Sequence, residues 1–434
     1  MIRAEEGYLA ELESAFLKYG DVPREVVVKQ DMLRLGLRFS DRALEAGKGA
    51  VLKSYRLFSL DMVAMDQMAR QESARVPEDL TVQGGTYGLR ATAVQVRLSP
   101  LSPYLVDVRE GQLALVVDGE AVGQVGYPQA PAWYGRTFED GTRYSEVVAL
   151  TMAGTKPFVT AFRNCQFGKG QQCLFCDINS HAAQMKRQGR YSVATPYKKV
   201  EQVAQVMETA YQEQTSPGTR PHSYTVTGGA ITSQLAGGKE DEFYLRYVRA
   251  IKERIGSRWS CRLETVAKDA ESLKRFRQEG VDIHEPNMEV WDERLFKVLV
   301  PGKDRHVGRD AYLRRMLEAV DIFGEGNVTT NLVSGVEMSQ PYGFQEVAAA
   351  VRSTAQGFDY LMDHGIIPRL TTWCLEPGSP LGHNKPPSLE YFVRIAQSWY
   401  ETWRKYDLPP PSGLGPMGPG RALTSNSAFM DVGY

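Results

Sequence analysis

The amino-acid sequence predicts an α/β fold, a partial TIM-like (β/α)6 barrel that follows an N-terminal helical plus antiparallel β accessory region. After residue 156, a short apolar run alternates six times with a longer helical pattern. Repeated β-α units form a parallel sheet covered by helices. Six units suit a partial barrel better than the eight of a closed one. Before residue 157 the text has a different character, which indicates a separate accessory region.

The accessory region divides into two parts. Residues 1–83 show helical spacing of apolar positions, as in "YLAELESAFLKY" and "YRLFSLDMVAMDQMAR", and we expect a helical N-terminal segment. Residues 84–156 contain short alternating or β-branched runs such as "LRATAVQVRL", separated by turns. The Asp118-Gly119 pair between two apolar runs is a hairpin signal. This part is predicted to be a small β-rich unit.

The barrel is predicted over residues 157–405, and a Pro/Gly-rich C-terminal tail over 406–434. Amphipathic stretches such as "DEFYLRYVRAIKERI" and "SLEYFVRIAQSWYETWRKYD" supply the helices. The six expected strands are 157–162, 223–229, 258–267, 281–290, 327–337 and 367–376.

Composition limits the classes of function. The chain has 434 residues, 51 Lys and Arg against 52 Asp and Glu, and a formal charge of -1. This balance gives no electrostatic argument for nucleic acid or an anionic membrane surface, so a small-molecule substrate is expected. The N-terminus does not resemble a signal peptide, and no apolar run is long enough for membrane insertion. Five cysteines do not form a disulfide framework, so a cytoplasmic location is expected.

Three of those five cysteines lie in one glycine-containing stretch, "NCQFGKGQQCLFC", directly after the first expected strand. In parallel β/α folds, functional residues lie on the loops that follow the strands. Thiolates are soft ligands for iron–sulfur clusters and zinc. Gly168 and Gly170 allow the loop to fold back, so that Cys165 reaches the centre bound by Cys173 and Cys176. Three ligands leave one iron of a cluster free to bind another molecule.

With Phe175 directly before Cys176, this loop resembles the radical S-adenosylmethionine (radical SAM) superfamily. The usual spacing is Cys-x3-Cys-x-aromatic-Cys; here the first gap is seven residues, so the subfamily is not assigned. The resemblance implies a [4Fe–4S] cluster, S-adenosyl-L-methionine and a flavodoxin or ferredoxin-type electron donor. It implies reductive cleavage of that cofactor to a 5′-deoxyadenosyl radical, which functionalises a C–H bond of a small molecule, in a biosynthetic pathway.

The same resemblance implies contacts with S-adenosylmethionine. "TGGA" at the end of the second expected strand matches a Gly-Gly-Glu-like family motif in its glycines and departs from it at Ala230. Glu264 in "CRLETV" is a candidate ribose-binding carboxylate, and "NLVSGVE" is similar to a stretch near the adenine. The implied cofactor-binding residues are Phe175, Gly228, Gly229, Ala230, Glu264, Ser334 and Gly335.

Two other classes of protein stay open. The three cysteines and His181 have the spacing Cys-x7-Cys-x2-Cys-x4-His, which suits a structural zinc site in a zinc-stabilised β/α-barrel hydrolase. A non-catalytic Fe–S binding protein is the second alternative, and it would hold a fully ligated cluster. Cys261 and Cys374 are each alone in a strand, where buried small hydrophobes are expected. No auxiliary cluster is expected from these two cysteines, and the sequence does not identify the product.

Overall fold

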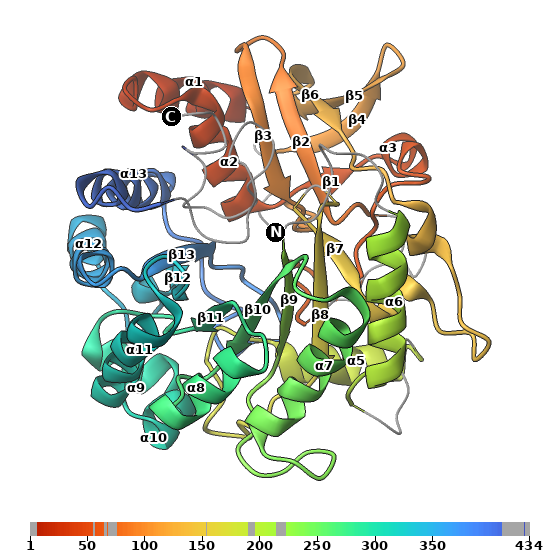
Figure 1. Cartoon of the computed structure of the whole chain (residues 1–434). Coiled ribbons are helices and arrows are strands. Elements are labelled where there is room, and N and C mark those ends of the chain that lie inside the picture. The colour runs from red at the N-terminus through yellow and green to blue at the C-terminus, as the bar shows by residue number, and fades with distance from the viewer. Residues whose placement is uncertain are drawn as a thin grey trace.

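The structure is a computed structural model that describes residues 7–54, 57–64, 67, 76–152, 154–189, 196–213, 223–409 and 429. Most of the tail predicted at 406–434 lies outside the described residues. The fold is α/β, with two main sheets and one strand pair (Figure 1). None of the helices within the described ranges is both long and apolar enough to span a bilayer.

Six parallel strands follow one another in chain order, and each coincides with a strand expected from the sequence. They are β8 (Lys156–Phe162), β9 (Ser223–Gly228), β10 (Ser260–Thr265), β11 (Ile283–Pro286), β12 (Thr329–Ser334) and β13 (Ile367–Thr372). β8 to β11 share one sheet, whose edge strand β7 (Ala149–Thr151) runs antiparallel to β8. β12 pairs with β13, and isolated parallel bridges such as His284–Val328 join this pair to the β11 side. Within the described residues, no ladder joins β13 to β7 or β8, so the array is open on that side.

Helices cover the outer surface of this strand array (Figure 1). α13 shows why such a sequence forms a covering helix: Tyr391, Ile395 and Trp399, spaced four residues apart, are all fully buried. The Trp399 indole also donates a hydrogen bond of 2.7 Å to the Pro368 carbonyl in β13. The helices are α5 (Ile178–Arg187), α6 (Val200–Glu213), α7 (Glu240–Ile255), α8 (Ala270–Gln278), α9 (Glu293–Leu299), α10 (Pro301–His306), α11 (Arg309–Phe323), α12 (Val347–Asp363) and α13 (Leu389–Lys405).

The N-terminal part forms a separate sheet with the strand order β1-β4-β5-β6-β2-β3. The expected hairpin is confirmed, because Asp118 and Gly119 both have positive φ between β5 and β6, and Val117 pairs with Glu120. The elements are α1 (Tyr8–Lys18), α2 (Arg24–Leu35), β1 (Arg38–Phe39), α3 (Asp41–Ala46), β2 (Asp79–Gly84), β3 (Leu89–Gln95), β4 (Leu105–Arg109), β5 (Gln112–Val117) and β6 (Glu120–Gly126). A short 3-10 turn (Ala132–Gly135) and α4 (Tyr144–Val147) lead to β7.

This N-terminal unit lies across the open side of the parallel array (Figure 1). α2 packs against both α13 and β13, and so joins the unit to the last β-α repeat. Residues 57–64, whose apolar spacing predicts a helix, are not helical. Leu57, Phe58 and Leu60 instead line an internal cavity, because an irregular segment can place neighbouring apolar side chains on the same side. The position of these side chains at the cavity, and not the local helical pattern, therefore decides the backbone structure of this segment.

Candidate active site

A cavity of about 310 Å³ lies between the N-terminal unit and the inner surface of the parallel strands. The cysteine loop forms one end, and Lys156, at the start of β8, lies along its wall. The wall also includes side chains from β9, β10, β12 and β13. A concave site lined by apolar residues and a few convergent polar groups is typical of a small-molecule site.

The structure brings all three cysteines of the loop to this cavity. Cys165, Cys173 and Cys176 line it together with Phe175. The Cys165 N–H donates a hydrogen bond of 2.9 Å to the Asn179 side-chain oxygen. Between the other two cysteines, Leu174 accepts from Leu381 and donates to the Leu299 carbonyl, at 3.0 and 2.9 Å. These bonds fix the loop at both ends, so the sulfur atoms have defined positions.

The glycine pair lies beside the cysteine loop, and the reason for glycine is visible. A Cβ on Gly229 would lie 1.9 Å from the Asn164 carbonyl oxygen and 2.6 Å from the Cys165 Cα. Only glycine admits such a close approach of two backbones. The Ala230 carbonyl accepts a hydrogen bond of 2.8 Å from the Gln166 N–H. The end of β9 and the cysteine loop therefore form one packed unit.

The remaining predicted contacts separate into two groups. Gly228, Gly229, Ala230 and Glu264 line the cavity. Ser334 is the last residue of β12, Gly335 follows it, and neither is part of the lining. The Gly335 N–H donates to Glu337 and to the Tyr391 hydroxyl of α13, at 2.8 and 3.0 Å. The structure thus unites the cysteine, glycine and Glu264 predictions at one site and places Ser334 and Gly335 beside it.

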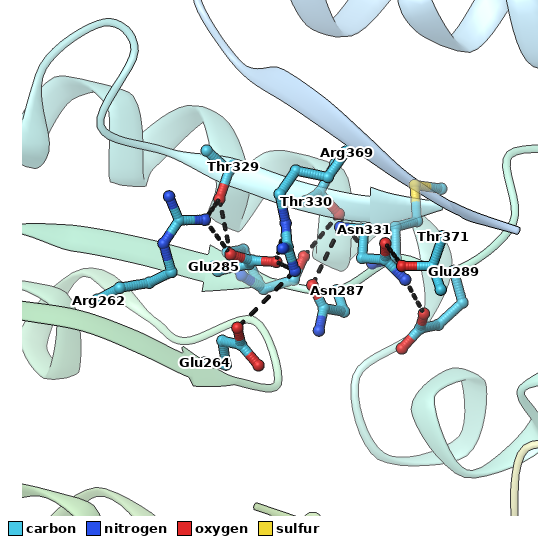
Figure 2. A network of polar contacts seen from close by, with 12 residues as sticks. Arg262, Glu264, Glu285, Asn287, Glu289, Thr329, Thr330, Asn331, Arg369 and Thr371 are labelled. Atoms are coloured by element: carbon cyan, nitrogen blue, oxygen red, sulfur yellow. Dashed lines mark hydrogen bonds and ion pairs between the residues drawn. The ribbon is translucent and has the colours of Figure 1, made fainter. Parts of the chain in front are cut away.

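The inner surface of the parallel strands carries a buried network of charged side chains (Figure 2). Glu285 on β11 accepts from Arg262 at 2.5 Å and from the Arg369 Nε at 2.7 Å, and its side chain is fully buried. Arg369 also lies 3.8 Å from Glu264. Burial by itself would raise the pKa of the Glu285 carboxyl, but Arg369 and Arg262 lower it to about 2. The two guanidinium groups and two carboxylates form one connected group.

A second polar group lies closer to the end of the cavity that holds the cysteines. Lys303 of α10 forms an ion pair of 2.7 Å with Glu289. Asn331 donates to the other oxygen of Glu289 at 3.2 Å and accepts from the Thr371 hydroxyl at 2.8 Å (Figure 2). Lys303, Glu289, Asn331 and Thr371 all line the cavity. Glu289 and Asn331 therefore link Lys303 of α10 to Thr371 of β13 at this wall.

The covering segment is joined to the cysteine loop by buried carboxyl groups. The Ser59 hydroxyl lies 3.0 Å from both Asp177, which follows Cys176, and Glu376, which follows β13. The Leu60 N–H donates to the same Glu376 oxygen at 2.5 Å. Burial raises the pKa of Asp177 to about 6 and that of Glu376 well above its ordinary value, with the neighbouring Asp177 charge adding to the second shift. The cover is thus fixed to the site by hydrogen bonds.

Glu285→Gln should be strongly destabilising, because it leaves two buried guanidinium groups without their shared carboxylate. Removing one partner of a buried ion pair costs about 3–5 kcal/mol. We expect a loss of that size in the free energy of unfolding, measured by urea denaturation. The exposed Asp359, paired with Lys405, provides the control, since Asp359→Asn should change stability little. An equal, small effect of both substitutions would contradict the role given to Glu285.

The pH dependence of stability provides a second readout for Glu285. Its folded-state pKa of about 2 lies below the ordinary glutamate pKa of about 4.3. The stabilisation is therefore fully present above about pH 4.3 and is lost as the pH falls toward 2. Glu285→Gln should flatten this part of the stability profile.

Comparison with known proteins gives partial similarities. No known family profile matches the chain. A bacteriochlorophyllide c C-7(1)-hydroxylase from Chlorobaculum limnaeum is 22% identical over 250 residues, which are 55% of this chain and 58% of that protein. A radical SAM methyltransferase from Sphaerobacter thermophilus superposes with a TM-score of 0.39 and 16% identity over 92% of each chain. A methylornithine synthase superposes with a TM-score of 0.39 and 15% identity over 57% of this chain and 62% of its own. The chain thus spans less than two thirds of the hydroxylase and of the synthase.

Three cysteines follow the first of six parallel strands, and the glycine pair that ends the second strand packs directly on their loop. This arrangement agrees with the resemblance of the cysteine loop to the radical SAM superfamily, which implies a [4Fe–4S] cluster and S-adenosylmethionine.

The residues of the site fit the [4Fe–4S] cluster that the resemblance implies. Burial raises the pKa of the Cys173 thiol to about 12 and also raises the pKa values of Cys165 and Cys176. Without a metal, such thiols keep their protons, and metal binding releases them. Within the described residues, no three His, Cys, Asp or Glu side chains converge on a single metal ion, as the zinc alternative with His181 requires. A cluster needs no such convergence, because each thiolate binds a different iron.

Sequence reasoning missed the positively charged side chains on the inner surface of the strands. Lys156, Arg262 and Arg369 were not among the predicted residues. Neighbouring side chains along a strand point to opposite faces. Leu263 and Leu370, which follow Arg262 and Arg369, are buried apolar residues, so a charged residue at an alternate position indicates a polar interior. That alternation was the available signal.

Proposed function

We propose that Cys165, Cys173 and Cys176 hold one [4Fe–4S] cluster, and that the enzyme functionalises a C–H bond of a small-molecule substrate in a biosynthetic pathway. The observation that supports this most is one cavity that joins three thiols, the glycine pair and Glu264 under a fixed cover. When bound, the cluster and S-adenosylmethionine supply a 5′-deoxyadenosyl radical that removes a hydrogen atom from carbon. The three thiols suit this role, because cysteine thiolates are the usual protein ligands of [4Fe–4S] clusters.

The chain's own residues provide binding and shielding. Gly228, Gly229 and Ala230 present backbone beside the cysteine loop, where we place the methionine end of S-adenosylmethionine. We propose that Glu264 binds the ribose and that the ring of Phe175 faces the cluster. Ser334 and Gly335 stay predictions for the adenine. Leu57, Phe58 and Leu60 exclude water from the cavity, and such exclusion protects a reactive species from side reactions.

We further propose that β8 to β13 form a partial (β/α)6 barrel over residues 157–405, open toward the accessory regions 1–83 and 84–156. Residues 406–434 are proposed to be a separate Pro/Gly-rich C-terminal tail. A cytoplasmic location and a flavodoxin or ferredoxin-type donor accord with a cluster that needs reducing electrons. The partial similarity to a hydroxylase that acts at one named carbon supports a reaction at a C–H bond.

Cofactor cleavage tests this function directly. Protein purified without oxygen and reduced with dithionite should convert S-adenosylmethionine to methionine and 5′-deoxyadenosine, slowly without substrate and faster with the correct one. Both products are measured by mass spectrometry. A fully cluster-loaded, reduced protein that never releases 5′-deoxyadenosine, with several reductants and candidate substrates, would refute the proposed chemistry and favour a binding role.

A further inference from the structure

Lys156, the first residue of β8, is a buried lysine at the cavity wall. Its side chain lines the cavity, and the residue is only 7% exposed. It lies opposite Thr151 in the β7–β8 pair. Within the part of the chain that the structure describes, its Nζ makes no hydrogen bond or ion pair. The Nζ therefore faces the cavity with no partner from the described residues, which leaves it available to a ligand.

Charge counting identifies the sign of that ligand. The charged groups that act on Lys156 are Arg262, Arg369, Glu285 and Glu264. The two guanidinium groups and two carboxylates balance one another in the network described above. A protonated Lys156 is the fifth charge, and it has no counter-charge of its own among the residues that the structure describes. Because an unpaired buried ammonium is unfavourable, one negative charge would complete the site.

The position of Lys156 also limits the shape of the ligand. Phe158, Thr225 and Arg262 pair at one level across β8, β9 and β10, and Lys156 lies two residues below that level. The cysteine loop follows the opposite end of β8. Six residue steps at about 3.3 Å each separate the two ends of this strand by about 20 Å. A ligand bound at Lys156 therefore extends from the floor of the cavity toward the cysteines.

We propose that Lys156 binds the carboxylate of a monoanionic small-molecule substrate at the floor of the cavity. A carboxylate fits better than a phosphate dianion, because only one positive charge lacks a partner. The inference rests on the proposed function only in taking the cavity to hold the substrate. The anchored end lies away from the cysteine loop, so the opposite end of the molecule presents the reacting carbon.

The state of Lys156 without ligand gives the proposal a second readout. Burial, together with Arg262 and Arg369, lowers the pKa of Lys156 well below its ordinary value. A carboxylate that binds there raises this pKa again, because it stabilises the ammonium form. Binding therefore takes up protons from solution, and the affinity falls as the pH rises.

Octanoate is the probe, with octanamide as its uncharged match and octyl phosphate as the dianion. Calorimetric titrations of the full-length protein, in two buffers of different ionisation heat at one pH, should show octanoate binding with proton uptake. Lys156→Met should weaken octanoate binding at least tenfold and remove the uptake. Lys156→Arg should bind octanoate without proton uptake, because a guanidinium stays protonated. The exposed Lys405→Met serves as control and should behave as wild type.

Several outcomes would overturn the proposal. They are octanamide binding as tightly as octanoate, unchanged octanoate affinity in Lys156→Met, absence of octanoate binding, and stronger Lys156-dependent binding of octyl phosphate. If Lys156→Met does not fold, the wild-type comparison of octanoate with octanamide still decides. These titrations need neither S-adenosylmethionine nor turnover, so their failure is distinguishable from failure to cleave the cofactor.

Discussion

Replacing Cys165, Cys173 and Cys176 together with alanine is expected to abolish iron binding. The three thiols line one cavity, and the proposed cluster is bound only through their sulfur atoms, which alanine lacks. Protein reconstituted without oxygen should be brown in the wild type and colourless in the variant. Iron and acid-labile sulfide should fall to background, and S-adenosylmethionine cleavage should be lost with them.

Cys261 supplies the matched control for the cysteine experiment. It is fully buried in β10 and does not line the cavity. Cys261→Ala should keep the full iron content, with at most a modest loss of stability from the smaller side chain. Stoichiometric zinc without iron in the wild-type protein would refute the cluster and revive the zinc alternative.

Gly229→Val should disrupt the cysteine loop itself. The added Cβ would meet the Asn164 carbonyl at 1.9 Å, and backbone atoms at that distance must shift. Overpacking of this kind costs about 1–3 kcal/mol, occasionally more. We expect a lower thermal midpoint, reduced iron incorporation and weaker binding of S-adenosylmethionine, each measured on the same preparation.

Gly168 is the control for Gly229, because it lies in the cysteine loop that Gly229 contacts, and a Cβ there meets no atom within 4 Å. Gly168→Ala should stay within about 0.5 kcal/mol of wild-type stability. Wild-type stability and iron content in Gly229→Val would show that the close approach of β9 to the cysteine loop is not required.

Local patterns were enough to predict the parallel strands and the cysteine loop. Each of the six expected strands is present, because short apolar runs bounded by turns depend mainly on local sequence. The Asp118-Gly119 hairpin was predictable for the same reason, since positive φ at both positions favours these residues. The segment 57–64 was not predictable in this way, because its apolar side chains Leu57, Phe58 and Leu60 line the cavity and do not form a helix face.

The sequence by itself determined the fold class, through its repeated β-α units, and the position of three cysteines after the first expected strand. Only the tertiary structure decided what surrounds those cysteines. It showed that Gly229 is required by the neighbouring Asn164 backbone, and that Glu285 joins Arg262 to Arg369 across three strands. It also placed Lys156 in the same cavity as the thiols, without a counter-charge. Such contacts join residues far apart in the chain, and their energies depend on burial and distance, which no local pattern contains.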